Sequence, residues 1–171
     1  MRPLPQALRL LDRATQGANI VGTLLIAGLV ILILWDVVGR EAFGTPLPGV
    51  PELLSLSIVA IVFLQVPQAL RAGRLTRSDG LITALHRRRP RVAAAMETLF
   101  EALGLLVMIA ILYAHWPILT RAIARNDFVG AVGNVTFPVW PAKLMILIGS
   151  ALLALQFAAN TVRRFTKGST K

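Results

Sequence analysis

Long apolar runs alternate with polar segments along the chain. Ala18–Trp35 and Leu53–Leu70 contain no charged residue, and two further apolar runs cover Val92–Thr120 and Ala142–Val162. About 20 apolar residues in an α-helix, rising 1.5 Å per residue, cross a hydrocarbon core of about 30 Å. The pattern therefore predicts an all-α membrane protein with about four transmembrane helices, at about residues 18–38, 53–70, 93–120 and 142–162.

The polar segments between these runs are predicted to be loops. Residues 39–52 are rich in glycine and proline, which break helices. Residues 71–91 are rich in arginine, and residues 121–141 form the last loop. The whole chain, 1–171, is expected to be a single integral membrane domain.

The N-terminal residues 1–17 have the pattern of a short amphipathic helix. Its apolar stripe consists of Leu4, Leu8 and Leu11. Arg9 and Arg13 lie elsewhere on the helical wheel. Such a helix buries its leucines in the inner leaflet and places its arginines among anionic phospholipid headgroups. A frayed basic tail is the alternative.

Lysine and arginine are distributed unevenly between the two sides of the predicted helices. The two terminal segments and the loop 71–91 carry fourteen of these residues, whereas the other two loops carry four when Lys143, at the start of the fourth helix, is included. Basic residues are enriched on the cytoplasmic side of membrane proteins. We therefore expect both termini in the cytoplasm of a bacterial cell and the loops 39–52 and 121–141 outside the inner membrane. Trp35 and Trp140 are expected to anchor their helices at the outer interface.

Composition supports the membrane class and narrows the chemistry. Hydrophobic residues make up 56% of the chain and charged residues 15%, with a mean hydropathy of +0.69. The net charge of +10 does not indicate nucleic acid as a partner, because the charges flank the apolar runs, where they set topology. The chain has no cysteine, which excludes disulfides and thiolate metal sites. Its two histidines, His86 and His115, are too few for most all-histidine metal or haem sites.

The ionisable residues are predicted to lie near helix ends. Asp36 is expected at the outer end of the first helix, within reach of water, and Glu97 and Glu101 near the cytoplasmic start of the third. Carriers of ions or charged substrates usually hold ionisable groups at mid-membrane. His115 lacks the partner that a haem with two axial histidines requires. The pattern argues against an enzyme, a cofactor and an independent small exporter.

Small residues recur at helical spacing on two predicted helices. They are Ser150, Ala154 and Ala158 on the fourth helix, and Ala110 and Ala114 on the third. Small residues let helix backbones approach closely in lipid. The spacing fits either internal packing or a partner interface.

Two stretches resemble a known family. The first combines Asp36-Val-Val-Gly-Arg40, Phe43-Gly44, Pro46, Gly49 and Glu52-Leu53 with the segment from Leu70 to Asp79. The second is Phe137-Pro-Val-Trp-Pro141, which leads into the fourth helix. With the four-helix layout, they resemble the small membrane (Q) subunit of tripartite ATP-independent periplasmic (TRAP) transporters over nearly the whole chain. The sequence departs from the family at Leu75, where histidine is common, and at Ser78, where a hydrophobic residue is common.

The resemblance implies a function. In such systems a periplasmic protein captures an organic anion, often a carboxylate or sialic acid, and a large subunit carries it by a sodium-coupled elevator movement. The small subunit packs on the static scaffold of the large one and helps to dock the periplasmic protein. The expected partners are therefore the large membrane subunit, the periplasmic substrate-binding protein and phospholipids. The alternatives are an anchor or assembly subunit of another complex, such as a respiratory enzyme, and an independent small exporter.

Four charged residues receive roles from this resemblance. Arg40 and Glu52 flank the proline- and glycine-rich loop, where they either pair to brace the turn, contact the periplasmic protein, or remain solvated charges. Arg77 and Asp79 are expected to order the cytoplasmic loop.

Overall fold

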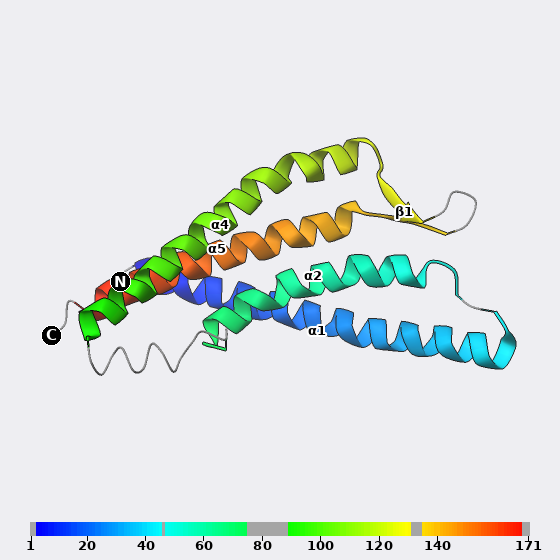
Figure 1. Ribbon diagram of the computed structural model, residues 1–171, viewed down its shortest axis with the longest axis horizontal. Helices are drawn as coiled ribbons and strands as arrows, with labels where there is room; N and C mark the ends of the chain where they lie inside the picture. The colour runs from blue at the N-terminus through cyan, green and yellow to red at the C-terminus, as the bar shows by residue number, and fades with distance from the viewer. Residues whose placement is uncertain (1–2, 46, 75–88, 131–134, 169–171) are drawn as a thin grey trace.

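The computed structural model describes residues 3–45, 47–74, 89–130 and 135–168, which form four long helices and one small hairpin (Figure 1). The helices are α1 (Pro3–Phe43), α2 (Val50–Arg71), α4 (Pro90–Ala124) and α5 (Trp140–Gly168). Strands β1 (Phe128–Gly130) and β2 (Thr136–Pro138) pair antiparallel between α4 and α5. Within the described residues, four helices are long and apolar enough to cross a membrane, which confirms the predicted fold class.

Helix α1 is longer than predicted at both ends. The N-terminal residues are helical, but they continue directly into the first membrane helix rather than form a separate short helix. The polar residues between the two segments do not interrupt α1, because Asn19 and the neighbouring side chains can all adopt helical geometry. At the other end α1 continues past Trp35 to Phe43, inside the segment that was predicted to be a loop. Gly44, with a φ of 65°, follows its last residue.

The helices form an open row in the order α1, α2, α5, α4. Helix α2 packs against α1 on one side and against α5 on the other. The principal packing partner of α4 is α5. Figure 1 shows this order, with α4 diverging from α5 toward the hairpin. In the most hydrophobic stretch of each helix, the share of buried residues is 28% in α2 and 33% in α5, compared with 11% in α1 and 6% in α4. Two central helices therefore carry the core, and two edge helices leave most of their apolar surface uncovered.

Glycines allow neighbouring helices to approach closely. A Cβ atom added at Gly149 of α5 would overlap the carbonyl oxygen of Phe63 on α2. A Cβ atom added at Gly104 of α4 would lie 2.6 Å from the Cζ atom of Phe157 on α5. In lipid, where apolar surfaces gain little from leaving the solvent, such close contacts supply the dispersion energy that holds helices together.

The small residues on the two helices have different surroundings. Ser150 and Ala154 are buried and Ala158 is half-buried, so the spacing on α5 serves packing within the chain. Ala110 and Ala114 of α4 are exposed. The α4 pair therefore lies on an outward face.

Candidate functional site

Asp36 organises the turn between α1 and α2. The prediction that Asp36 lies at a helix end within reach of water is wrong, because α1 continues for two more turns. The Asp36 side chain is only 10% exposed. Its Oδ1 atom accepts a hydrogen bond from the Leu47 N–H at 2.8 Å, and its Oδ2 atom accepts one from Nη2 of Arg40 at 2.9 Å. One carboxylate thus joins the end of α1 to the loop that leads into α2.

The two charges that flank this loop are placed differently from each other. The salt bridge that the structure shows for Arg40 is with Asp36, one helical turn earlier, rather than with Glu52. The Arg40 side chain is 61% exposed, whereas Glu52 is half-buried in the first turn of α2. Arg40 therefore presents its charge at the surface of this end of the molecule.

The hairpin lies against the same end of the bundle. Phe137 of β2 packs against Gly49, where an added Cβ atom would lie 2.6 Å from the Cε2 atom of the ring. The Val139 N–H donates to the carbonyl oxygen of Asp127 at 3.1 Å, and Nζ of Lys143 lies 3.6 Å from the Asp127 carboxylate. These contacts connect the α1–α2 turn, the hairpin and the start of α5 into one surface.

At the opposite end, Arg71 links α2 to α1. Its Nε atom lies 3.1 Å from Oδ1 of Asp12, and Nη1 donates to the Asp12 carbonyl oxygen at 3.4 Å and to Oε1 of Gln68 at 3.3 Å. Both charged side chains are partly buried. The N-terminal turns of α1 are therefore held against the protein by a specific pair.

Buried polar side chains also connect the helices. Gln156 of α5 is completely buried, and its Nε2 atom donates to Oγ1 of Thr15 on α1 at 2.9 Å. Glu101 of α4 is 1% exposed and accepts a hydrogen bond from Oγ1 of Thr161 on α5 at 3.5 Å. Polar pairs of this kind fix the rotation and register of neighbouring membrane helices, since unpaired polar groups are costly in hydrocarbon.

Of the remaining predicted site residues, Trp35 and Trp140 are exposed on their helices, and the other two are not described. Trp35 is 69% exposed on α1, and Trp140 is 42% exposed at the first residue of α5. Their role as interface anchors stays a prediction. Arg77 and Asp79 lie outside the described residues.

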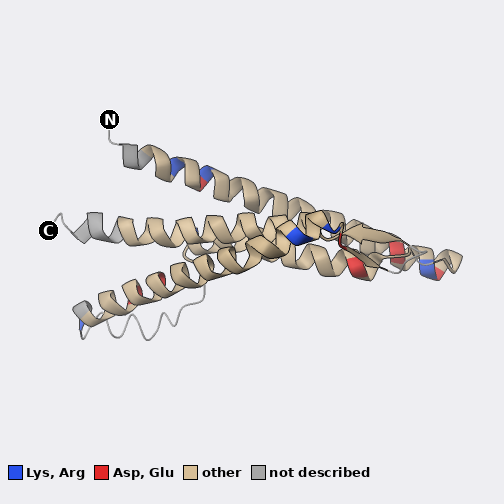
Figure 2. Cartoon of the chain, turned by 90° about the horizontal axis from the view of Figure 1, so that it is seen from above, with Lys and Arg blue, Asp and Glu red and all other residues tan. Residues whose placement is uncertain are grey.

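Figure 2 marks the charged residues along the helices, which have long stretches without charge between them. In the described part of the chain, no three His, Cys, Asp or Glu side chains come together in a group that could hold a metal ion. Among the described residues, the polar contacts at each end brace helices and turns.

Residues 29–167 match the family described as tripartite ATP-independent periplasmic transporters, DctQ component. The chain belongs to this DctQ family. No curated protein and no solved structure matched the chain significantly.

Membership of the DctQ family confirms several predictions. DctQ proteins are transporter components and not enzymes, so the predicted lack of catalytic activity is correct. The family and the four apolar helices make this DctQ component a multi-pass inner-membrane protein and a small permease subunit of a TRAP transporter. In TRAP systems a DctQ component works with a large membrane component and a periplasmic binding protein.

The sequence pattern indicated neither the hairpin nor the contact of Asp36 with Leu47. Each strand has three residues, too few to show alternation of polar and apolar positions. The Asp36–Leu47 contact joins residues eleven positions apart across a loop, and helical periodicity carries no information about it. The proline and glycine content of residues 39–52 indicated the turn but not the group that holds it.

Proposed function

We propose that this DctQ component scaffolds the large, sodium-coupled elevator subunit of its transporter and helps to dock the periplasmic substrate-binding protein. The transported substrates would be organic anions such as carboxylates or sialic acid. The single observation that carries this proposal is the family match over most of the chain. The open row of helices supports it, because it leaves two apolar edges available.

Both edge helices have large exposed apolar side chains along their lengths. On α4, Leu106 is 64% and Trp116 is 60% exposed, and on α1, Leu24 and Ile31 are each 66% exposed. Lipid can cover one edge while the large subunit covers the other. A chain with this arrangement extends the width of a larger partner without supplying a path for solute.

The proposed orientation places both termini in the cytoplasm. The first turns of α1 and the last turns of α5 lie at the same end as the start of α4 (Figure 1). Loop 71–91, which joins α2 to α4, holds much of the arginine. This arrangement agrees with the positive-inside rule. Alkaline phosphatase should be inactive when fused after Lys171 and active when inserted in the α1–α2 turn, and the reverse pattern would refute the orientation.

Co-purification and reconstitution test the scaffold role. We expect the tagged chain to co-purify in detergent with a large, roughly dozen-helix permease, and vesicles to accumulate the anion only when both subunits and the periplasmic protein are present. Solute accumulation by the isolated chain would refute the proposal and favour an exporter. A haem absorbance band in the purified complex would instead favour a respiratory anchor.

Charge reversal at Arg40 tests the docking role. Arg40→Glu is expected to reduce substrate uptake by about 10-fold, because a like charge at an interface opposes a complementary partner. The small and large subunits should still co-purify, since the Arg40 side chain is largely exposed. Arg125→Glu, at the exposed end of α4, serves as the matched control and should retain uptake. Normal uptake by Arg40→Glu would remove Arg40 from the docking surface.

A further inference from the structure

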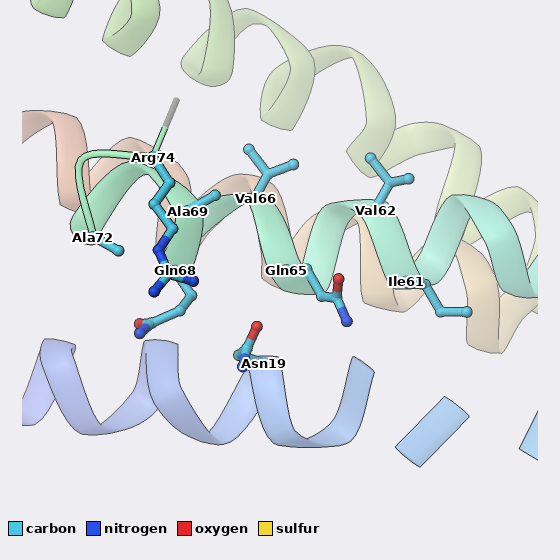
Figure 3. Close-up of a pocket in the computed structure, with 9 residues that line it drawn as sticks. All are labelled: Asn19, Ile61, Val62, Gln65, Val66, Gln68, Ala69, Ala72 and Arg74. Atoms are coloured by element: carbon cyan, nitrogen blue, oxygen red, sulfur yellow. The ribbon is translucent and has the colours of Figure 1, made fainter. Parts of the chain in front are cut away.

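A groove of about 450 Å³ lies between α1 and the second half of α2 (Figure 3). Asn19 lines the α1 side of the groove, and residues from Ile61 to the end of α2 line the other side. From Ile61 to Arg71 the helix rises about 15 Å, which equals half of a hydrocarbon core of about 30 Å. The groove therefore has the depth of one membrane leaflet.

The polarity of the groove changes along its length. Arg74 and Gln68 line the end near the helix terminus, and Asn19 and Gln65 face each other near the middle (Figure 3). Farther from the helix end, the lining residues Ile61, Val62 and Val66 are apolar. Ile61 lies on the side of α2 that faces α1, whereas Val62 and Val66 extend from the other side (Figure 3). A charged mouth, amide groups below it and an apolar interior match the order of groups in a phospholipid.

The end of α2 places Arg74 at this mouth. Gly73 has a φ of 66°, its N–H donates to the Leu70 carbonyl oxygen at 3.1 Å, and the Arg74 N–H donates to the Ala69 carbonyl oxygen at 2.9 Å. These two bonds form a Schellman motif, which reverses the chain after the helix. The Arg74 side chain is thereby directed back along α2 toward Gln68 (Figure 3).

The two arginines at the end of α2 differ in their partners. The Arg71 guanidinium is paired with Asp12 at 3.1 Å, so its charge is balanced within the protein. Among the residues that the structure describes, no carboxylate pairs with the Arg74 side chain. Within that part of the chain its guanidinium is uncompensated, and a guanidinium binds phosphate oxygens with two parallel hydrogen bonds.

We propose that this groove binds one anionic phospholipid. The lipid phosphate is bound by Arg74, the amides of Gln68 and Asn19 donate to headgroup and ester oxygens, and one acyl chain lies against Ile61. The apolar depth of the groove favours a lipid over a soluble anion. The proposal depends on the membrane location of the chain and not on its partners in transport.

Native mass spectrometry of the purified full chain tests this site. With phosphatidylglycerol and phosphatidylcholine supplied equally, we expect wild type to retain one phosphatidylglycerol in preference to phosphatidylcholine. Arg74→Gln should reduce that retention by about 10-fold, the effect of losing one charge-assisted interaction. Arg125→Gln, which removes an exposed arginine at the end of α4 and outside the groove, should retain it fully.

A groove-filling variant provides a second, independent measurement. Ala69→Leu places extra volume in the groove and should also lower phosphatidylglycerol retention, whereas Ala102→Leu, at an exposed position of α4, should not. Equal retention by wild type and Arg74→Gln would overturn the proposal, as would equal binding of phosphatidylcholine. Displacement of the signal by excess inorganic phosphate would show a site for a free anion instead of a lipid.

Discussion

Replacement of Gly149 by leucine is expected to lower the free energy of unfolding by about 3 kcal/mol, the upper part of the range for an overpacked site. Gly149 is buried at the contact between the two central helices, where even a Cβ atom would overlap the Phe63 carbonyl oxygen. Backbone atoms of a helix cannot move aside as a flexible side chain does, so α5 and α2 must separate. The melting temperature in detergent and the monomeric fraction on size-exclusion chromatography should both fall.

Gly28→Leu is the matched control for this effect. Gly28 lies in the apolar stretch of α1, and a Cβ atom added there has no other heavy atom within 4 Å. Glycine inside a helix is about 0.8–1.0 kcal/mol less favourable than alanine, and leucine ranks next to alanine in helix propensity. We expect Gly28→Leu to keep or slightly raise the melting temperature. Equal losses in both variants would mean that bulk, and not the α2–α5 contact, causes the effect.

Replacement of Asp36 by alanine is expected to cost about 2–3 kcal/mol of stability, as for the loss of a hydrogen bond to a charged group in a nearly buried site. The Leu47 N–H would lose its acceptor, and the turn between α1 and α2 would lose the group that connects its two sides. The measurements are the melting temperature and the rate of proteolytic cleavage between residues 39 and 52. We expect faster cleavage with the rest of the chain still folded.

Two further variants separate the contributions of Leu47 and Arg40 to this turn. Asp36→Asn keeps a carbonyl oxygen for the Leu47 N–H and should cost about 1 kcal/mol. Arg40→Gln should cost less than about 1 kcal/mol, because an ion pair with a side chain 61% exposed is screened by solvent. If Arg40→Gln cost as much as Asp36→Ala, the ion pair, and not the backbone hydrogen bond, would hold the turn.

The open row of helices bears on how a DctQ component contributes to transport. A closed four-helix bundle hides one face of every helix, whereas here α1 and α4 stay at the edges with few buried residues. The interior polar pairs, such as Gln156 with Thr15, join neighbouring helices. This arrangement is compatible with the proposed role as a broad support for a larger carrier.

The number and approximate positions of the membrane helices followed from the sequence alone. A bilayer requires about 20 consecutive apolar residues, so uncharged runs such as Ala18–Trp35 and Leu53–Leu70 are directly readable. The family was also recognisable from the motifs around Asp36 and Phe137, and the match over residues 29–167 confirms it. Helix ends were less well predicted, because the polar residues before Asn19 and after Trp35 are equally compatible with a loop and with a helix that extends into the interface.

The order of the helices and the contacts between them were decided only by the tertiary structure. In lipid, a helix is apolar on its packed face and on its exposed face alike, so periodicity does not show which side meets a neighbour. Three contacts illustrate this. Gly149 packs against Phe63, and Asp36 accepts a hydrogen bond from the Leu47 N–H, so both contacts join residues that are distant in sequence. Arg74 lies at the α1–α2 groove because a turn reverses the chain after α2. The sequence determines which segments enter the membrane because solvation acts on each segment separately. Packing depends on shape complementarity between segments, which exists only after the chain has folded.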